Sequence, residues 1–90
     1  DKREYERAIS DYNEAIRLNP KSAPAFNNRG GVWRMKGDHE RAIADYSEAI
    51  RLDPRDSDAF GNRAAAWAAY PRQAGNSVMT DNQIFISYTK

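Results

Sequence analysis

The 90-residue sequence contains no cysteine and a single histidine, His39. These shortages exclude disulfides, thiolate metal sites and cysteine nucleophiles, and one histidine alone makes no zinc site. No apolar run approaches the ~20 residues that a membrane-spanning helix needs, so we expect no membrane partner. The formal net charge is only +1, which gives no electrostatic reason to expect nucleic acid. The composition therefore predicts neither metal nor cofactor.

Catalytic constellations are also missing. Ser10, Ser47 and Ser87 have no histidine placed for a triad, and the carboxylates alternate with arginines at helical spacing, as on a solvated face. We therefore predict that the chain is not an enzyme. Residues 1–4 are charged, with no apolar core behind them, so they do not resemble a signal peptide. We also expect the protein to be located in the cytoplasm. Since the first residue is not methionine, we expect the chain to be a piece of a longer protein.

The sequence repeats itself at a spacing of 34 residues. The register is kept over most of residues 1–70, which chance does not produce. Matching pairs include Ala8 and Ala42, Asp11 and Asp45, Tyr12 and Tyr46, Ala15 and Ala49, Pro20 and Pro54, Asn28 and Asn62, Arg29 and Arg63, and Trp33 and Trp67.

Each period has the hydrophobic pattern of amphipathic helices. In residues 41–52 the charged residues fall on the opposite face from the apolar ones, so we expect Arg41 to pair with Asp45, and Glu48 with Arg51, on the surface. The apolar residues follow the i, i+1, i+4, i+7, i+8 spacing of one helical face: Ala42, Ile43, Tyr46, Ala49 and Ile50.

Helix boundaries are marked by residues with local preferences. Gly37 breaks the preceding helix, Asp38 can cap the next one, and Pro54 ends it. Residues 23–36 form a second helix, with Ser22 as its cap. Each period is thus a pair of antiparallel helices, which cannot bury its apolar stripe alone but can do so when pairs stack.

We therefore predict an all-α fold of four helices in residues 1–70. A complete helix-turn-helix repeat spans residues 23–56. The second helix of one repeat, from about residue 4 to 18, precedes it, and the first helix of another, residues 57–70, follows it.

The residues at the repeat spacing resemble the tetratricopeptide repeat (TPR) family. The resemblance covers about residues 3–70 and implies a protein–protein interaction scaffold, in which the first helices of the repeats line a groove for a peptide or partner protein. The motif residues are Gly30, Trp33, Gly37, Asp38, Ala42, Tyr46, Ala49 and Pro54, with Ala8, Tyr12, Ala15 and Pro20 in the first copy and Phe60, Ala64 and Trp67 in the third.

The resemblance also implies which residues face the groove. Asn28 and Asn62 are the strongest candidates, because an amide can both donate to and accept from a peptide backbone; packing or capping of a neighbouring turn is the competing interpretation. Arg34 could pair with an acidic residue of the ligand. The lysine of the family's carboxylate clamp is missing. The full set is Asn27, Asn28, Gly31, Arg34, Met35, Gly61, Asn62, Ala65, Ala68 and Ala69.

The C-terminal residues leave the repeat pattern. Residues 71–83 are typical of a linker, and residues 84–88 are β-branched and aromatic, as in a strand. Residues 79–90 resemble the first strand of a Toll/interleukin-1 receptor (TIR) domain, which implies a regulatory TPR arm of a TIR-domain NAD hydrolase or signalling protein. The family's catalytic glutamate is absent from this chain. An edge strand or a disordered tail is the alternative.

A third hypothesis is self-assembly. The helix 57–70 carries Trp67 in a run of alanines but has no second helix, and the helix 4–18 has no first helix. The two open ends predict a homo-oligomer built by a heterologous contact.

Overall fold

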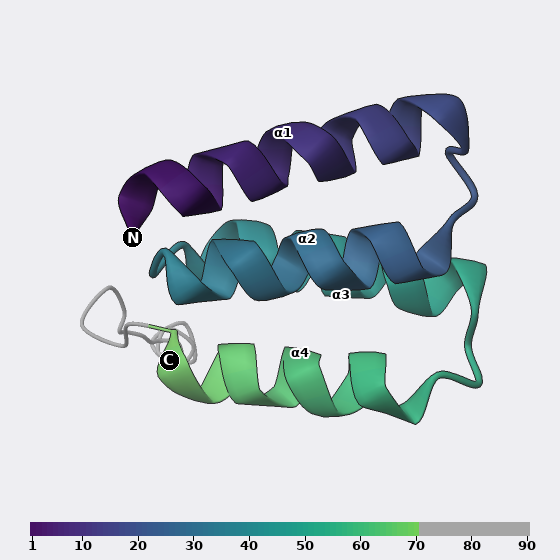
Figure 1. Ribbon diagram of the computed structural model, residues 1–90. Coiled ribbons are helices and arrows are strands. Elements are labelled where there is room, and N and C mark those ends of the chain that lie inside the picture. Colours follow the sequence, from purple (N-terminus) through teal and green to yellow (C-terminus); the bar gives the residue numbers. More distant parts are fainter. Residues whose placement is uncertain (71–90) are drawn as a thin grey trace, which may run out of the picture.

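The computed structural model describes residues 1–70, and these form four α-helices (Figure 1). The helices are α1 (Lys2–Leu18), α2 (Ala23–Met35), α3 (His39–Leu52) and α4 (Ser57–Ala69). The predicted all-α fold is confirmed, with boundaries that differ by one or two residues: α1 begins at Lys2 rather than residue 4, and α2 and α4 each end one residue early. The predicted linker and strand lie outside the described residues.

The early start of α1 has a local cause. The Asp1 carboxylate accepts hydrogen bonds from the backbone N–H groups of Arg3 and Glu4, at 2.8 and 3.1 Å. The N-terminal amine of Asp1 in turn donates a hydrogen bond to Glu4 Oε1 at 3.4 Å, which completes a capping box. Because Asp1 caps the helix, α1 begins earlier than its hydrophobic pattern alone predicts.

The predicted boundary residues act as expected. The Ser22 and Asp38 side chains cap α2 and α3 by accepting backbone hydrogen bonds from Ala25 and Arg41, at 3.3 and 3.1 Å. Gly37 has φ 87°, a left-handed conformation that L side chains rarely adopt, and it separates α2 from α3. The turns between the helices are therefore encoded locally.

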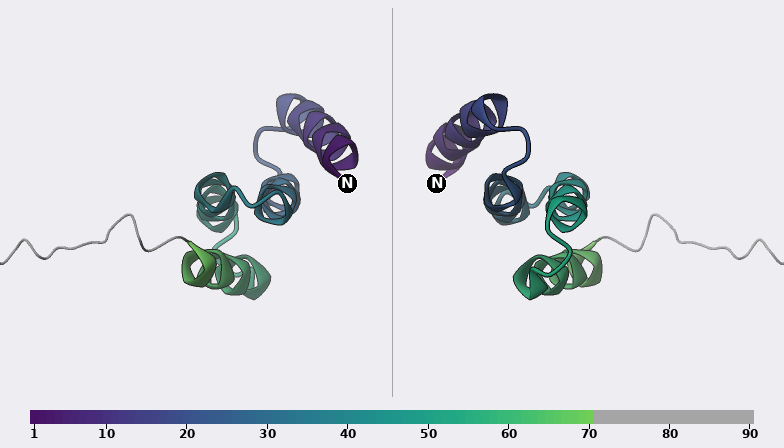
Figure 2. Two further views of the ribbon diagram at one scale, coloured as in Figure 1. Left: turned by 90° about the vertical axis from the view of Figure 1, so that its left-hand side faces the viewer. Right: turned by 90° about the vertical axis from the view of Figure 1, so that its right-hand side faces the viewer.

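Consecutive helices run antiparallel and pack against one another (Figure 1). The view along the helix axes shows α2 and α3 side by side between α1 and α4 (Figure 2). α4 packs mainly on α3 and also reaches α2, whereas α1 contacts α2 alone among the described helices. α3 is therefore enclosed between two helices, and α1 is covered by one.

Two small clusters form the core, and alanine dominates both. Tyr46, 1% exposed, is the largest fully buried side chain of residues 1–70. A Cβ added at Gly30 would lie 2.8 Å from Tyr46 Cε1, so the tyrosine ring rests directly on the backbone of α2. This close contact explains why glycine stands at position 30. The clusters are Ala42, Tyr46 and Ala66 with Trp33 and Ile43, and Ala23, Ala49 and Ala59 with Phe26, Ile50 and Leu52.

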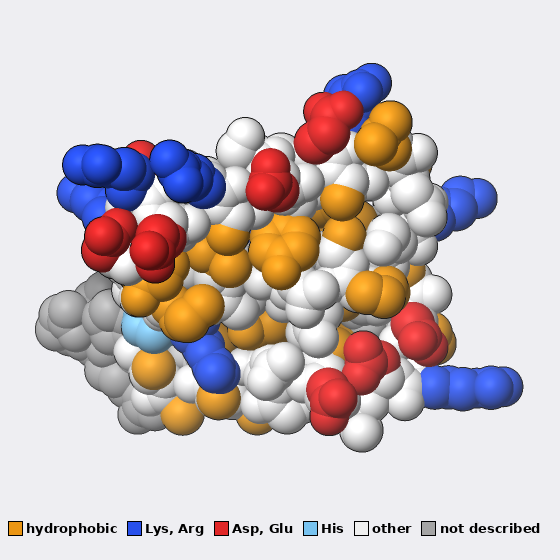
Figure 3. Space-filling view, viewed as in Figure 1, with side chains coloured by type: hydrophobic (Ala, Val, Ile, Leu, Met, Phe, Trp, Pro, Cys, Tyr) orange, Lys and Arg blue, Asp and Glu red, His pale blue; other side chains and the backbone are white. Residues whose placement is uncertain are grey.

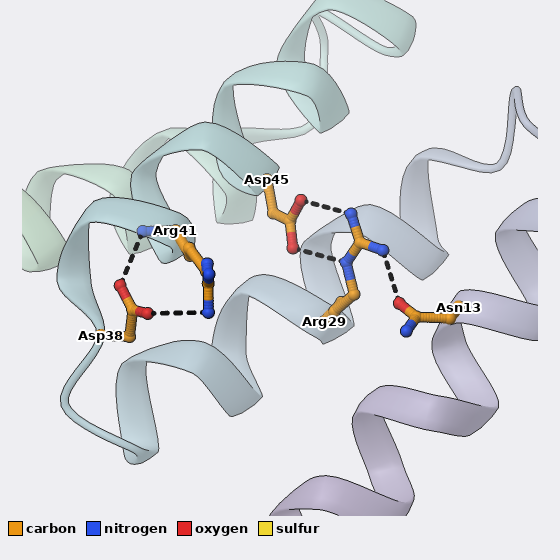
Figure 4. Close-up of polar contacts among 5 residues, drawn as sticks. All are labelled: Asn13, Arg29, Asp38, Arg41 and Asp45. Carbon is orange, nitrogen blue, oxygen red and sulfur yellow. Dashed lines mark hydrogen bonds and ion pairs between the residues drawn. The ribbon is translucent and has the colours of Figure 1, made fainter.

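The predicted surface pair of Arg41 with Asp45 is wrong. Asp45 is only 6% exposed and pairs with Arg29 across the α2–α3 contact, while Arg41 Nη1 lies 3.4 Å from Asp38 Oδ2 (Figure 4). Periodicity placed Asp45 with the charged face, but it lies at the edge of that face, where a guanidinium on the neighbouring helix can hold it. The predicted pair of Glu48 and Arg51 is confirmed.

Candidate functional site

Arg29 holds three helices together. It donates from Nε and Nη2 to the two carboxylate oxygens of Asp45, at 2.8 Å each, and from Nη1 to Asn13 Oδ1 at 2.7 Å (Figure 4). Hydrogen bonding to Asp45 raises the pKa of Arg29 above its ordinary value, and partial burial opposes this effect. The network fixes α1 and α3 relative to α2, which is the helix predicted to carry half of the groove residues.

Part of this network recurs one repeat later. Arg63 donates from Nη1 to Ser47 Oγ at 3.0 Å, as Arg29 does to Asn13, and its guanidinium lies 5.6 Å from the Phe60 ring centroid. Since Arg63 follows Arg29 by 34 residues, and Ser47 follows Asn13 likewise, the structure repeats at the spacing of the sequence. The network was not predicted from the sequence: Arg29 and Asp45 both recur at the repeat spacing, but the recurrence alone does not show that they pair.

The predicted groove residues Asn27 and Asn62 meet. Asn62 Nδ2 donates to Asn27 Oδ1 at 3.2 Å, which joins α2 to α4 directly. Asn28, which the sequence named with Asn62 as a strongest candidate for ligand contact, is exposed. Within residues 1–70, the Asn27 amide nitrogen and the Asn62 carbonyl oxygen make no further hydrogen bond, so one donor group and one acceptor group stay available.

Small residues accompany these amides on α2 and α4. Gly31 is half-buried, and a Cβ there would meet Tyr46 Oη at 3.7 Å, an ordinary contact. Among residues 1–70, no atom outside the local backbone lies within 4 Å of a Cβ added at Gly61. Ala65 and Ala69 are exposed, as is Ala68. A ligand backbone could therefore approach both helices closely.

Basic groups gather at the C-terminal end of α2. Met35 is 60% exposed and lines a hollow of about 220 Å³ together with Lys2, Tyr5 and Lys36. Arg34, in the last turn of the same helix, is half-buried and does not line this hollow. None of these three basic side chains pairs with a carboxylate within the described residues. Sequence reasoning missed Lys2 and Tyr5, because they belong to α1 and reach this end of α2 only through the fold.

The face that carries α2 mixes apolar and charged surface. Apolar side chains gather across its middle, and most charged ones lie nearer its margins (Figure 3). This distribution suits a partner that offers apolar side chains and some charge.

Other kinds of site find little support in residues 1–70. No group of three or more histidine, cysteine, aspartate or glutamate side chains is arranged to hold a metal ion there. His39 Nδ1 is buried and has no hydrogen-bond partner in the same range. No helix of this part of the chain is long and apolar enough to cross a membrane.

Comparison with known families agrees with the helical arrangement. A family model described as the tetratricopeptide repeat matches residues 1–57. The chain belongs to the tetratricopeptide repeat family. The resemblance noted from the sequence is therefore confirmed, and with it the general role of TPR units in protein–protein interaction. The search of curated proteins gives no match. Residues 79–90, which resemble the TIR strand, lie beyond the TPR match.

Proposed function

We propose that this TPR chain binds an extended peptide of a partner protein across α2 and α4. The observation that carries the proposal is the Asn27–Asn62 hydrogen bond, which places a donor and an acceptor group side by side between the two helices. A peptide backbone carries the complementary acceptor and donor at every residue. The exposed Gly61 and Ala65 leave room for it.

The charges favour a ligand that is acidic at one end. Lys2 and Lys36 line the hollow at the end of α2, and Arg34 belongs to the last turn of that helix. None of the three has a carboxylate partner in the described chain. Met35 and Tyr5 add apolar surface in the same hollow. We therefore propose that a segment of alternating acidic and apolar residues lies over Met35, with its remaining length toward Asn62.

Fluorescence anisotropy with two labelled synthetic peptides tests this proposal. One peptide alternates glutamate and leucine, and the other alternates lysine and leucine at the same length. The 90-residue chain should bind the acidic peptide at least about tenfold more tightly, because like charges at an interface are unfavourable. The preference should fall as salt is raised.

A matched pair of variants locates the interaction. Arg34→Glu should remove most of the preference for the acidic peptide, while Arg55→Glu, the same charge change at an exposed residue of the α3–α4 turn, should leave it. Equal binding of both peptides, or equal effects of both substitutions, contradicts the proposed ligand chemistry.

Three further expectations stay proposals. Residues 1–70 form one interaction module without enzymatic activity, the parent protein is cytoplasmic, and the module is the regulatory arm of a TIR-domain NAD hydrolase or signalling protein. The resemblance that motivates the last lies outside the described residues. Sequence beyond Lys90 tests it: an α/β pattern with a catalytic glutamate supports the TIR hypothesis, and its absence rejects it.

A further inference from the structure

One face of α1 is partly exposed, whereas the corresponding face of α3, one repeat later, is fully buried. In α3, which is packed between α2 and α4, Ala42, Tyr46 and Ala49 are 0%, 1% and 0% exposed. Their counterparts in α1 are only half-buried, because α2 is the one described helix that covers α1. These counterparts, one repeat earlier, are Ala8, Tyr12 and Ala15.

The last helix is open in the complementary way. Trp67 is 54% exposed, whereas Trp33, its counterpart in α2, packs against the cluster around Tyr46. The Arg41 guanidinium of α3 also lies 4.7 Å from the Trp33 ring centroid. Trp67 thus lies on the face of α4 that corresponds to the face of α2 packed against α3.

The two open faces carry the two halves of one ion pair. Arg29 uses Nη1 for Asn13, and Nε and Nη2 for Asp45. Arg63 uses Nη1 for Ser47, and within residues 1–70 its Nε and Nη2 have no partner. The residue one repeat before Asp45 is Asp11, which is exposed on α1 and forms no ion pair in the same range.

We propose that α4 of one chain packs on α1 of a second copy, as α2 packs on α3 within a chain. Arg63 then donates two hydrogen bonds to Asp11 of the second copy, and Arg7 of that copy covers Trp67 as Arg41 covers Trp33. The contact joins different faces of the two chains, so a free α1 and a free α4 are left at the ends of every assembly. This proposal does not depend on the peptide proposal, because the partner that binds here is a second copy of the chain and not a peptide.

One substitution limits how closely the two chains approach. Ala64 stands where α2 has Gly30, and a Cβ at Gly30 would lie 2.8 Å from the Tyr46 ring. Tyr12 of the second copy must therefore shift relative to the position that Tyr46 occupies. We expect an association weaker than the internal α2–α3 packing, and Ala64→Gly should strengthen it.

Light scattering coupled to size exclusion tests the inference on the 90-residue chain. The mass should rise above 10.2 kDa as concentration increases. Asp11→Arg should raise the dissociation constant about thirtyfold or more, as expected when one partner of a desolvated charge pair is reversed. Glu6→Arg is the matched control, with the same change of charge on the same helix. The Glu6→Arg variant should associate with the wild-type dissociation constant, because Glu40, the counterpart of Glu6 one repeat later, stays exposed.

A mixing experiment shows whether the contact joins unlike faces. Trp67→Arg blocks the α4 face and leaves α1 intact, and Asp11→Arg does the reverse. Each variant alone should be monomeric, and an equimolar mixture should give a species of twice the chain mass and nothing larger. Circular dichroism of each variant shows that loss of association is not loss of fold.

Two results overturn the inference. A wild-type chain that stays at 10.2 kDa at every concentration shows that another segment covers these faces or that they tolerate water. Association that Asp11→Arg does not weaken, or variants that do not complement each other on mixing, places the contact elsewhere.

Discussion

Arg29 and Asp45 meet through two parallel hydrogen bonds of 2.8 Å across the contact between α2 and α3. Their side chains are 21% and 9% exposed, so the pair is largely removed from water. Asn13 accepts a third hydrogen bond from the same guanidinium, which adds α1. One arginine therefore fixes the relative positions of three of the four helices.

Asp45→Asn is expected to destabilise the fold by about 3 kcal/mol, the lower end of the cost of breaking a buried ion pair, since Arg29 keeps some contact with solvent. Chemical denaturation measures this loss. Asp11→Asn makes the same change at the same repeat position, where the carboxylate is exposed and unpaired within residues 1–70. At a protein concentration where the chain is monomeric, Asp11→Asn should change the free energy of unfolding by less than about 0.5 kcal/mol. Equal costs at the two positions contradict the role given to the α2–α3 pair.

Two adjacent glycines of α2 should respond oppositely to alanine. Gly30→Ala brings a Cβ within 2.8 Å of the Tyr46 ring and forces the core apart, which typically costs about 1–3 kcal/mol. The gain in helix propensity, about 1 kcal/mol, offsets only part of this. Gly31→Ala makes an ordinary 3.7 Å contact and should raise stability by about 0.5–1 kcal/mol. Thermal melts compare the two, and a Gly30→Ala variant as stable as Gly31→Ala contradicts the packing described.

Alkaline pH should weaken the fold through Tyr46. Burial raises the pKa of its hydroxyl above the ordinary value of 10.0, with a smaller opposing effect from Arg34. The folded state thus keeps this proton while the unfolded chain loses it, so the stabilisation is complete below pH 10 and declines as pH rises above it. Urea midpoints measured from pH 9 to 11 should fall less in Tyr46→Phe than in the wild type.

The hydrogen bond between α2 and α4 can be tested by removing one amide. Asn62→Ala leaves Asn27 without its partner and should lower the free energy of unfolding by about 1 kcal/mol. Asn28→Ala removes an exposed amide and should have little effect on stability. If Asn28→Ala is the more damaging change, the pairing of Asn27 with Asn62 does not describe the folded chain.

Much of the fold could be predicted from the sequence because its information is local or periodic. The 34-residue spacing, Ser22, Gly37, Asp38 and Pro54 locate three of the helices to within two residues. Asp45 could not be placed from periodicity alone, because a carboxylate at the edge of a face can turn either to water or to an arginine on another helix. Only the packing of α2 on α3 decides this.

The candidate site was predicted less completely than the fold. The family resemblance supplied Asn27 and Asn62 as members of one face, but it did not show which amide would meet which. Lys2 and Tyr5 were missed because the hollow beside Met35 combines the start of α1 with the end of α2. Contacts between segments far apart in the chain carry no periodic pattern that a single sequence can display.

The most direct test of the central claim is to map the bound peptide on the protein. Backbone amide shifts of the ¹⁵N-labelled chain would be recorded while the acidic glutamate–leucine peptide is added. We predict that the perturbed amides belong to α2 and α4, centred on Asn27, Arg34 and Asn62, with a second group around Tyr5. Perturbations confined to α3 and the remainder of α1 would show that the chain holds its partner on another face, and would contradict the proposed function.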